Sequence, residues 1–327
     1  MKRLNIRKFT SVFCCIIFAV SGLCGCGASA SGGGSGSGKI LFVQLDNEDT
    51  FRAALGAGIL DAASSQGVTI DEVDTGDSVA KQVEVISTAA SSGYSGIICR
   101  LADVNTALQI EDATQLPIVF VNNQPEEDRL SNSKYVYVGS PEKESGRYQA
   151  EYVWNKLGKP SEINIVIMRG EKGHSATEGR SNAVRDYFME NNVKVNIVFS
   201  DYANWSTDKA YEYMDILSKQ NVSFDAVFCN NDSMALGVVD YLDKHGKSDI
   251  PVVGVDATAD GCASIAAGGM DFTVLQSAAG QGAKAVEAIH AMAGGKSISD
   301  IEGASDNGKY IWVPFERVDA SNVSQYQ

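Results

Sequence analysis

The amino-acid sequence predicts an α/β protein with two doubly wound lobes, each built around a parallel sheet. Three observations lead to this fold class. The chain has 327 residues. Because a single hydrophobic core rarely extends over so many residues, this length favours two lobes. Its 44% of hydrophobic residues are typical of a folded globular protein. From Lys39 onward, short β-branched apolar runs alternate with segments of helical period, the pattern of β-α-β units.

The N-terminal 25 residues have the features of a secretory signal peptide. Four cations and no acid lie within residues 1–8, and an apolar run covers residues 12–20. A membrane-spanning helix needs roughly 20 apolar residues, so a retained anchor helix is the weaker interpretation. We expect the segment to be cleaved and the protein to be extracytoplasmic.

Residues 26–38 are expected to tie the protein to the membrane surface. The sequence Leu23-Cys24-Gly25-Cys26 resembles the lipobox of bacterial lipoproteins, which implies that Cys26 becomes the lipidated N-terminus. Acyl chains hold a protein at a membrane with about 0.8 kcal/mol for each buried CH₂. The following Gly, Ser and Ala residues cannot pack and predict a flexible tether.

Charge and cysteine content exclude several function classes. A net charge of -14 disfavours nucleic acid, whose phosphates are bound by Lys and Arg. Outside the targeting region only Cys99, Cys229 and Cys262 remain, and two of them end apolar runs, where Cys acts as a small hydrophobe. No zinc-type spacing of Cys and His occurs. We expect neither a disulfide framework nor a bound metal or cofactor.

The first lobe is predicted to begin with a strand over residues 39–45 and a helix over about 51–66. Further strands are expected at residues 68–73, 96–99, 117–121 and 135–138. A helix over about 142–157 then opens a second series. Its strands are expected at residues 163–168, 193–198, 225–229, 251–255 and 272–276. A helix over about 278–293 and a strand over 309–314 follow, and periodicity assigns them to neither lobe.

The function is expected in the loops that follow the strands. In open α/β sheets, ligands bind outside the carboxyl ends of the strands. These loops carry carboxylates, carboxamides, a His, a nearby Arg and two aromatics, which suit a neutral polyhydroxylated molecule. The candidates are Asp49, Phe51, Asn122, His174, Arg180, Trp205, Asn231 and Asp256.

Together these segments resemble the type I periplasmic sugar-binding proteins, most closely those for glucose and galactose. The matching segments, in the family's order, are residues 49–51, 119–122, 137–139 with 143–146, 170–180, 204–205, 230–237 and 250–256. The resemblance implies a three-crossing hinge between an N-terminal lobe (39–140 plus 277–311) and a C-terminal lobe (141–276 plus 312–327). It also implies a monomer that closes over a monosaccharide and delivers it to an ABC permease.

The resemblance also implies roles for the candidate residues. Phe51 and Trp205 would cover opposite faces of the sugar ring. Asp49, Asn122, His174, Arg180, Asn231 and Asp256 would bond its hydroxyls, with Gln276 at the late hinge. Each residue has a structural alternative. Asp49 could cap a helix, Asn and Asp could close turns, Phe51 or Trp205 could be buried, and Arg180 could be a solvated charge.

Two departures from the family pattern concern specificity. Ala176 stands where the glucose/galactose type has a second acid, and Gln276 stands where it has an Asn. The missing acid favours a glycoside, a deoxy sugar or a different monosaccharide. Residues 158–162 replace the calcium loop of that type and hold too few oxygens for the ion.

Other function classes fit less well. The acids and His174 could be acid/base partners of an enzyme, but residues spread over both lobes lack the fixed geometry of a catalytic pair, and no nucleophile elbow or P-loop occurs. A sugar-sensing repressor would need a helix-turn-helix where the lipobox lies. Delivery of the liganded state to a sensor kinase or chemoreceptor, and binding of a non-hexose ligand, stay open.

Overall fold

The computed structural model describes residues 38–45 and 49–327. The expected signal peptide, the lipidation site at Cys26 and the tether up to residue 37 lie outside the described residues. Within the described part of the chain, each helix is too short or too polar to cross a membrane.

The first lobe contains a six-stranded sheet in the order β11-β5-β4-β3-β1-β2, with every neighbouring pair parallel. Its strands are β1 (Lys39–Gln44), β2 (Ile70–Asp74), β3 (Tyr94–Cys99), β4 (Ile118–Val121), β5 (Tyr135–Gly139) and β11 (Tyr310–Trp312). Its helices are α1 (Thr50–Gln66), α2 (Val79–Thr88), α3 (Ala107–Asp112) and α9 (Ala278–Ala293).

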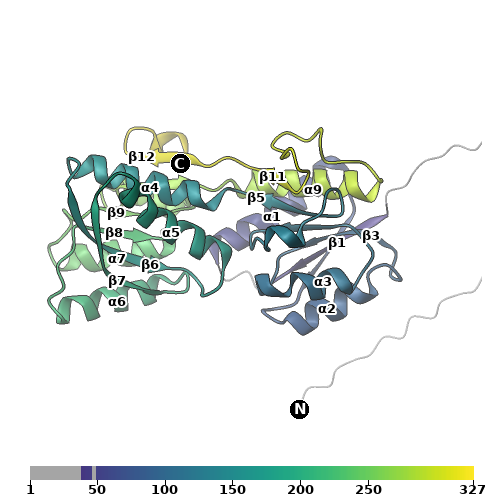
Figure 1. The fold of residues 1–327 in the computed structure, drawn as a ribbon, viewed down its shortest axis with the longest axis horizontal. Coiled ribbons are helices and arrows are strands. Elements are labelled where there is room, and N and C mark those ends of the chain that lie inside the picture. Colours follow the sequence, from purple (N-terminus) through teal and green to yellow (C-terminus); the bar gives the residue numbers. More distant parts are fainter. Residues whose placement is uncertain (1–37, 46–48) are drawn as a thin grey trace, which may run out of the picture. The chain divides into compact units, whose positions relative to one another are not determined.

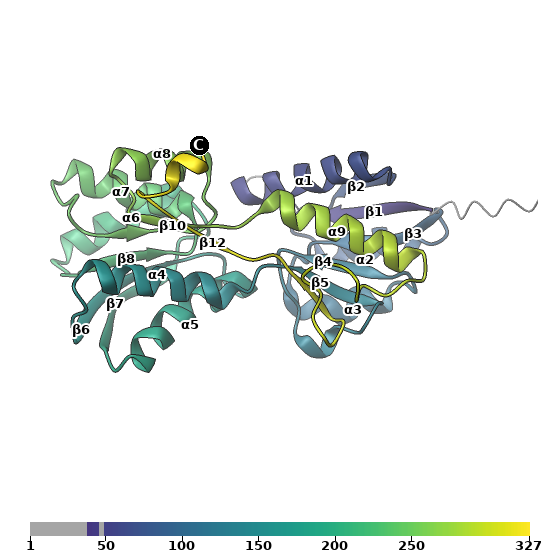
Figure 2. The same ribbon diagram turned by 90° about the horizontal axis from the view of Figure 1, so that it is seen from above.

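The sheet of this lobe is covered on both faces. Side chains alternate along β1, so that Ile40 and Phe42 pack with α1 and α9, whereas Leu41 and Val43 pack with α2 and α3. Figure 2 shows α9 running alongside α1 over the sheet. Helices on both faces of a parallel sheet make the lobe doubly wound, as the sequence predicts.

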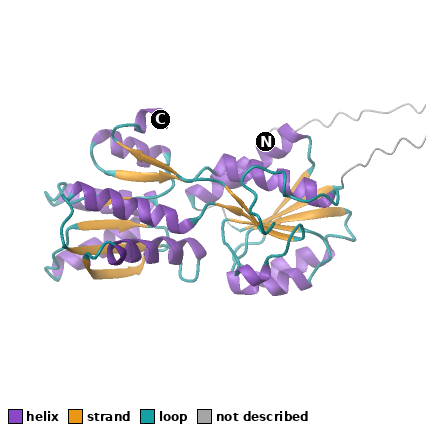
Figure 3. Cartoon of the chain, turned by 45° about the horizontal axis from the view of Figure 1, so that its top comes forward, coloured by secondary structure: helices purple, strands orange, loops and turns teal. Residues whose placement is uncertain are grey.

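The second lobe repeats this design with the order β12-β10-β9-β8-β6-β7. Its strands are β6 (Glu162–Arg169), β7 (Lys194–Tyr202), β8 (Ala226–Cys229), β9 (Val252–Val253), β10 (Phe272–Leu275) and β12 (Glu316–Asp319). Helices α4 (Glu142–Lys156) and α5 (Ser175–Glu190) cover one face. The other face carries α6 (Thr207–Lys219), α7 (Asp232–Lys244) and α8 (Ala259–Ala267). Figure 3 shows these layers of helix and strand.

The path of the chain between the sheets places the segments that periodicity left unassigned. The chain leaves the first sheet after β5, returns between β10 and α9, and leaves again between β11 and β12 (Figure 1). β11 pairs with β5, and α9 packs on α1. Short 3-10 helices lie at η1 (Val104–Thr106), η2 (Glu127–Arg129) and η3 (Val323–Gln325).

One strand of the second sheet is not foreseen from the sequence. β12 pairs antiparallel with β10 at the sheet edge, and of its residues only Val318 is buried. A strand with a single buried side chain carries no apolar run that the pattern could reveal. Apart from this edge strand, every named strand pair is parallel, which confirms the predicted fold class.

Candidate functional site

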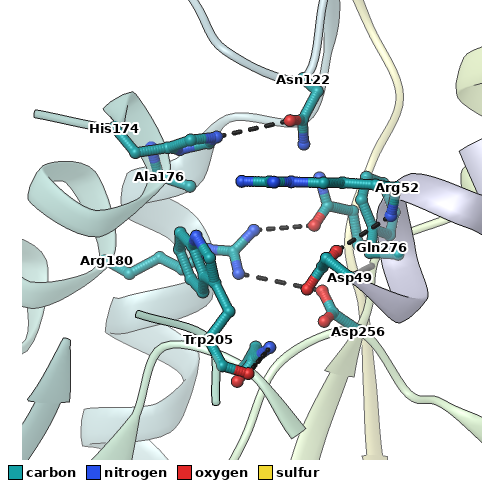
Figure 4. Close-up of a pocket in the computed structure, with 11 residues that line it drawn as sticks. Asp49, Arg52, Asn122, His174, Ala176, Arg180, Trp205, Asp256 and Gln276 are labelled. Atoms are coloured by element: carbon teal, nitrogen blue, oxygen red, sulfur yellow. Dashed lines mark hydrogen bonds and ion pairs between the residues drawn. The ribbon is translucent and has the colours of Figure 1, made fainter. Parts of the chain in front are cut away.

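All nine candidate residues of the sequence analysis line one pocket (Figure 4). The first lobe contributes residues at the start of α1 and after β4, and the second lobe contributes the first turns of α5 and residues that follow β6, β7, β8, β9 and β10. The pocket therefore lies at the carboxyl ends of strands from both sheets. Its lining is Asp49, Phe51, Arg52, Asn122, His174, Ala176, Arg180, Trp205, Asn231, Asp256 and Gln276.

Three of the polar candidates cap helices and line the pocket at the same time. Asp49 Oδ1 accepts a hydrogen bond from Arg52 N at 2.9 Å and caps α1. Asn231 Oδ1 accepts from Met234 N at 2.9 Å and caps α7. His174 Nδ1 accepts from Ala176 N at 3.2 Å and caps α5. The capping bond fixes each side chain and leaves its second polar atom for other partners.

The two aromatic candidates are partly built into the cores of the lobes. Phe51 is buried in the cluster that joins α1 to the first sheet, yet one edge of it lines the pocket. Trp205 is half-buried against the cluster under α6 and α7, and His174 meets it edge to face with 5.3 Å between ring centroids. The structural and the ligand-binding interpretations of these residues are therefore compatible.

Burial keeps the ring of His174 neutral. Its burial lowers the pKa of His174 well below the ordinary value, and the guanidinium groups of Arg100, Arg52 and Arg180 lower it further. Since Nδ1 accepts from Ala176 N, the proton lies on Nε2, which is 3.3 Å from Asn122 Oδ1. The same oxygen accepts from Arg100 Nε at 2.8 Å. Figure 4 shows the Asn122 amide nitrogen facing the pocket, where it can donate.

Arg180 lies at the centre of a buried network and is 3% exposed. Its Nε donates to Glu142 Oε2 at 2.6 Å, Nη1 to Asn230 O at 2.5 Å, and Nη2 to Gln276 Oε1 at 2.7 Å. Asp256 Oδ1 lies 3.8 Å from Nη1. A buried guanidinium needs such partners to offset the loss of water. The interpretation of Arg180 as a solvated charge is therefore wrong.

Asp232, which follows the pocket residue Asn231, holds the loop that carries Asp256. Its carboxylate accepts from Thr273 Oγ1 at 2.5 Å, from Thr258 N at 2.8 Å and from Thr258 Oγ1 at 3.2 Å. Burial raises the pKa of Asp232 to about 7, although the threonine bonds oppose the rise. Burial also raises the pKa of Asp256 well above its ordinary value. The positive charge of Arg180 lowers this pKa, whereas the negative charge of Asp232 raises it further.

The backbone is strained where it presents three of the candidates. Asn122 and Trp205 both have φ of 62°, and Asp256 has φ of 120°. Residues with a Cβ seldom adopt positive φ, which costs on the order of 1–3 kcal/mol when held by the surroundings. The indole of Trp205 in turn lies where a Cβ on Gly170 would be. The strained backbone therefore lowers the stability of the fold, but it places these three side chains at the pocket.

Arg52 is a pocket residue that the sequence analysis missed. It is 6% exposed, and Figure 4 shows its guanidinium extending from α1 into the pocket toward the side that carries His174 and Ala176. Its Nη2 donates to both carboxylate oxygens of Glu171 at 2.7 Å, so the pair joins the two lobes. One feature of the sequence could have indicated Arg52 as a pocket residue: it lies three residues after the capping Asp49, on the same side of the helix.

Two further hydrogen bonds join the lobes beside the pocket. Ser175 N donates to Asn123 Oδ1 at 3.2 Å, and Gln124 N donates to Ser175 Oγ at 2.9 Å.

Among residues 38–45 and 49–327, no three His, Cys, Asp or Glu side chains are grouped to hold a metal ion. The pocket therefore offers hydrogen-bond donors, acceptors and two aromatic surfaces, which can bind a polar ring but provide no nucleophile–base pair.

The geometry can now be compared with known proteins. Residues 40–297 match the family model described as periplasmic binding protein domain. The chain is 29% identical over 287 residues to a putative rhizopine-binding protein of Rhizobium meliloti, covering 86% of this chain and 89% of that protein. It is 26% identical over 297 residues to the D-galactose/methyl-galactoside binding periplasmic protein MglB of Haemophilus influenzae, with 86% of each covered.

A solved structure shows the same fold. An ABC transporter solute-binding protein from Bacillus halodurans, with bound myo-inositol, matches with a TM-score of 0.76 and 27% identity, over 88% of this chain and 96% of that one.

Proposed function

Since the chain belongs to the periplasmic binding protein family, we propose that its pocket binds one sugar ring of the glucose/galactose type. The protein is a solute-binding protein and not an enzyme. Membership of the family implies an extracytoplasmic location. The proposal concerns the ligand, the residues that hold it and the partner that receives it.

The observation that carries the proposal is the composition of the pocket wall. Phe51 and Trp205 supply aromatic surface from different lobes, and polar side chains fill the rest of the lining. Aromatic rings pack on the apolar C–H faces of a sugar, whereas its hydroxyls need partners at the rim. The wall therefore suits a ring that is apolar on its faces and carries hydroxyl groups at its edge.

Donors and acceptors in the wall would discriminate between sugars. Asp49 and Asp256 offer carboxylate oxygens, while the Asn122 amide and the Arg180 guanidinium donate. A buried polar group left without a partner costs about 1–3 kcal/mol. One misplaced hydroxyl would therefore weaken binding about tenfold to a hundredfold.

The partner follows from the family rather than from the pocket. We expect the liganded protein, a monomer anchored through Cys26 by lipid alone, to deliver the sugar to an ABC permease. The relatives include ribose import binding proteins of Bacillus subtilis and Escherichia coli. Presentation of the closed form to a sensor kinase or chemoreceptor uses the same pocket and is the alternative.

A thermal-shift screen of the purified protein tests the proposal. The panel holds D-glucose, D-galactose, D-ribose, D-allose and myo-inositol, and calorimetry follows each hit. A ligand at 100 times its Kd adds about 2.7 kcal/mol of stability, which raises the melting temperature measurably. The Trp205→Ala variant should lose the shift. Absence of a shift with all five compounds, in a protein that melts cooperatively, would refute the proposal.

A further inference from the structure

A second hollow adjoins the pocket that we assign to the sugar ring. This groove is open to solvent and lies between residues of the two lobes. Asp49, Arg52 and Trp205 line both the groove and the inner pocket. The two cavities therefore share a wall. The remaining groove residues are Thr50, Asp77, Glu171, Asn204, Ser206, Thr207 and Ser233.

The groove wall has the chemistry of a site for hydroxyl groups. Apart from the indole of Trp205, its side chains are hydroxyls, carboxylates, one carboxamide and one guanidinium. Thr50, Asp77, Asn204 and Thr207 are exposed, so the core does not require them. A hydrated, polyhydroxylated group could exchange its water for these side chains at little cost.

The ion pair between Arg52 and Glu171 lies at the boundary between the two cavities. Arg52 lines both of them, whereas Glu171 lines the groove alone. The Glu171 side chain is 41% exposed, so a ligand in the groove can reach the acceptor side of this pair. Since the buried guanidinium of Arg52 needs an acceptor, a ligand oxygen that extends past this boundary can take the place of the Glu171 carboxylate.

We propose that the groove is a second subsite and that the protein binds a two-part ligand, a disaccharide or a glycoside with a polar aglycone. One ring would fill the inner pocket and the second would lie in the groove. Trp205 would contact both parts, and Arg52, which can only donate hydrogen bonds, would meet an acceptor oxygen near the link. This inference rests on the sugar-binding function proposed above.

Calorimetry with matched pairs of ligands tests the subsite. The probes are D-galactose with melibiose and lactose, D-glucose with maltose and cellobiose, and myo-inositol with galactinol. Two variants fill the groove from opposite lobes at exposed positions, Asp77→Trp and Thr207→Trp. The matched control is Asn155→Trp, because Asn155 is exposed and lines a separate hollow on the second lobe.

The expected result is that at least one two-ring probe binds as tightly as its single-ring counterpart or more tightly. Both groove variants should weaken that probe at least tenfold and leave the single ring within twofold, while Asn155→Trp changes neither. Exclusion of every two-ring probe by a protein that binds a single ring would overturn the subsite and leave the proposed function standing. Equal effects of the groove variants on both ligand sizes would also overturn it. If no probe binds, both proposals fail.

Discussion

The buried carboxyl of Asp232 leads to a prediction about pH and stability. Burial raises its pKa from 3.8 to about 7, whereas in the unfolded chain the group keeps its ordinary value. Between pH 4 and pH 7 the unfolded chain therefore loses a proton that the folded protein retains. The free energy of unfolding falls as the pH rises through this window and changes no further above it, as far as this group is concerned.

The size of the effect follows from the two pKa values. A pH unit corresponds to about 1.36 kcal/mol, so the interval from 3.8 to about 7 amounts to about 4 kcal/mol. The substitution Asp232→Asn removes the titrating group and keeps its shape. An amide can still accept from Thr258 N, which the carboxylate does at 2.8 Å. The unfolding free energy of Asp232→Asn should therefore not fall by this amount as the pH rises from 4 to 7.

Urea unfolding of both proteins at pH 4, 5, 6, 7 and 8 measures the difference. The stability of the natural protein relative to Asp232→Asn should drop by about 3 kcal/mol from pH 4 to pH 7 and level off soon above it. Asp240→Asn, at an exposed acid of the same helix α7, is the control. A difference between natural protein and Asp232→Asn that does not vary with pH would refute the reasoning.

Three further predictions concern the pocket. Trp205→Ala should weaken ligand binding at least tenfold in calorimetry, because the indole supplies aromatic surface to the pocket. Glu142→Gln should lower the unfolding free energy by about 3 kcal/mol in urea titrations, because it removes the charge nearest to the buried guanidinium of Arg180, at 2.6 Å, and leaves only Asp256 at 3.8 Å. Ala176→Asp should improve calorimetric affinity for free hexoses about tenfold, because it adds a charged acceptor to the wall.

Each of these predictions has an outcome that contradicts it. An unchanged affinity of Trp205→Ala would remove the indole from the binding surface. Unaltered stability of Glu142→Gln would mean that the guanidinium finds water or another acceptor. Weaker or equal hexose binding by a folded Ala176→Asp would mean that no sugar hydroxyl meets an acceptor at that part of the wall.

Apart from the edge strand β12, the sequence was sufficient for the order of the strands because both lobes are periodic. The predicted helix over about 51–66 is α1, Thr50–Gln66, and the predicted strand over 135–138 is β5, Tyr135–Gly139. Agreement is poorer where pairing between distant segments decides the structure. β9 is limited to Val252–Val253, although the apolar run continues to Val255, because the chain bends there toward the strained Asp256.

The site could be predicted only as far as its residues lie in loops after strands. Asn122, Trp205 and Asp256 follow strands, so their position in the chain indicates the pocket. Arg52 lies within a helix, and its place in the pocket depends on how the lobes meet at Glu171. Asp232 falls within a matching segment, but its role depends on the distant Thr273. A single sequence carries no record of such contacts between remote residues.

The left-handed backbone at three pocket positions has a consequence for engineering. Asn122, Trp205 and Asp256 have conformations that glycine would adopt without strain. Glycine would relieve the strain, but it would also remove the packing of Trp205 on the second-lobe core and the acceptor that Asn122 gives to Arg100. The strain and these contacts are therefore linked, so that neither can be improved by the usual exchange of a left-handed residue for glycine. An engineer who wants a more heat-stable protein has to look for stabilising substitutions away from these three positions.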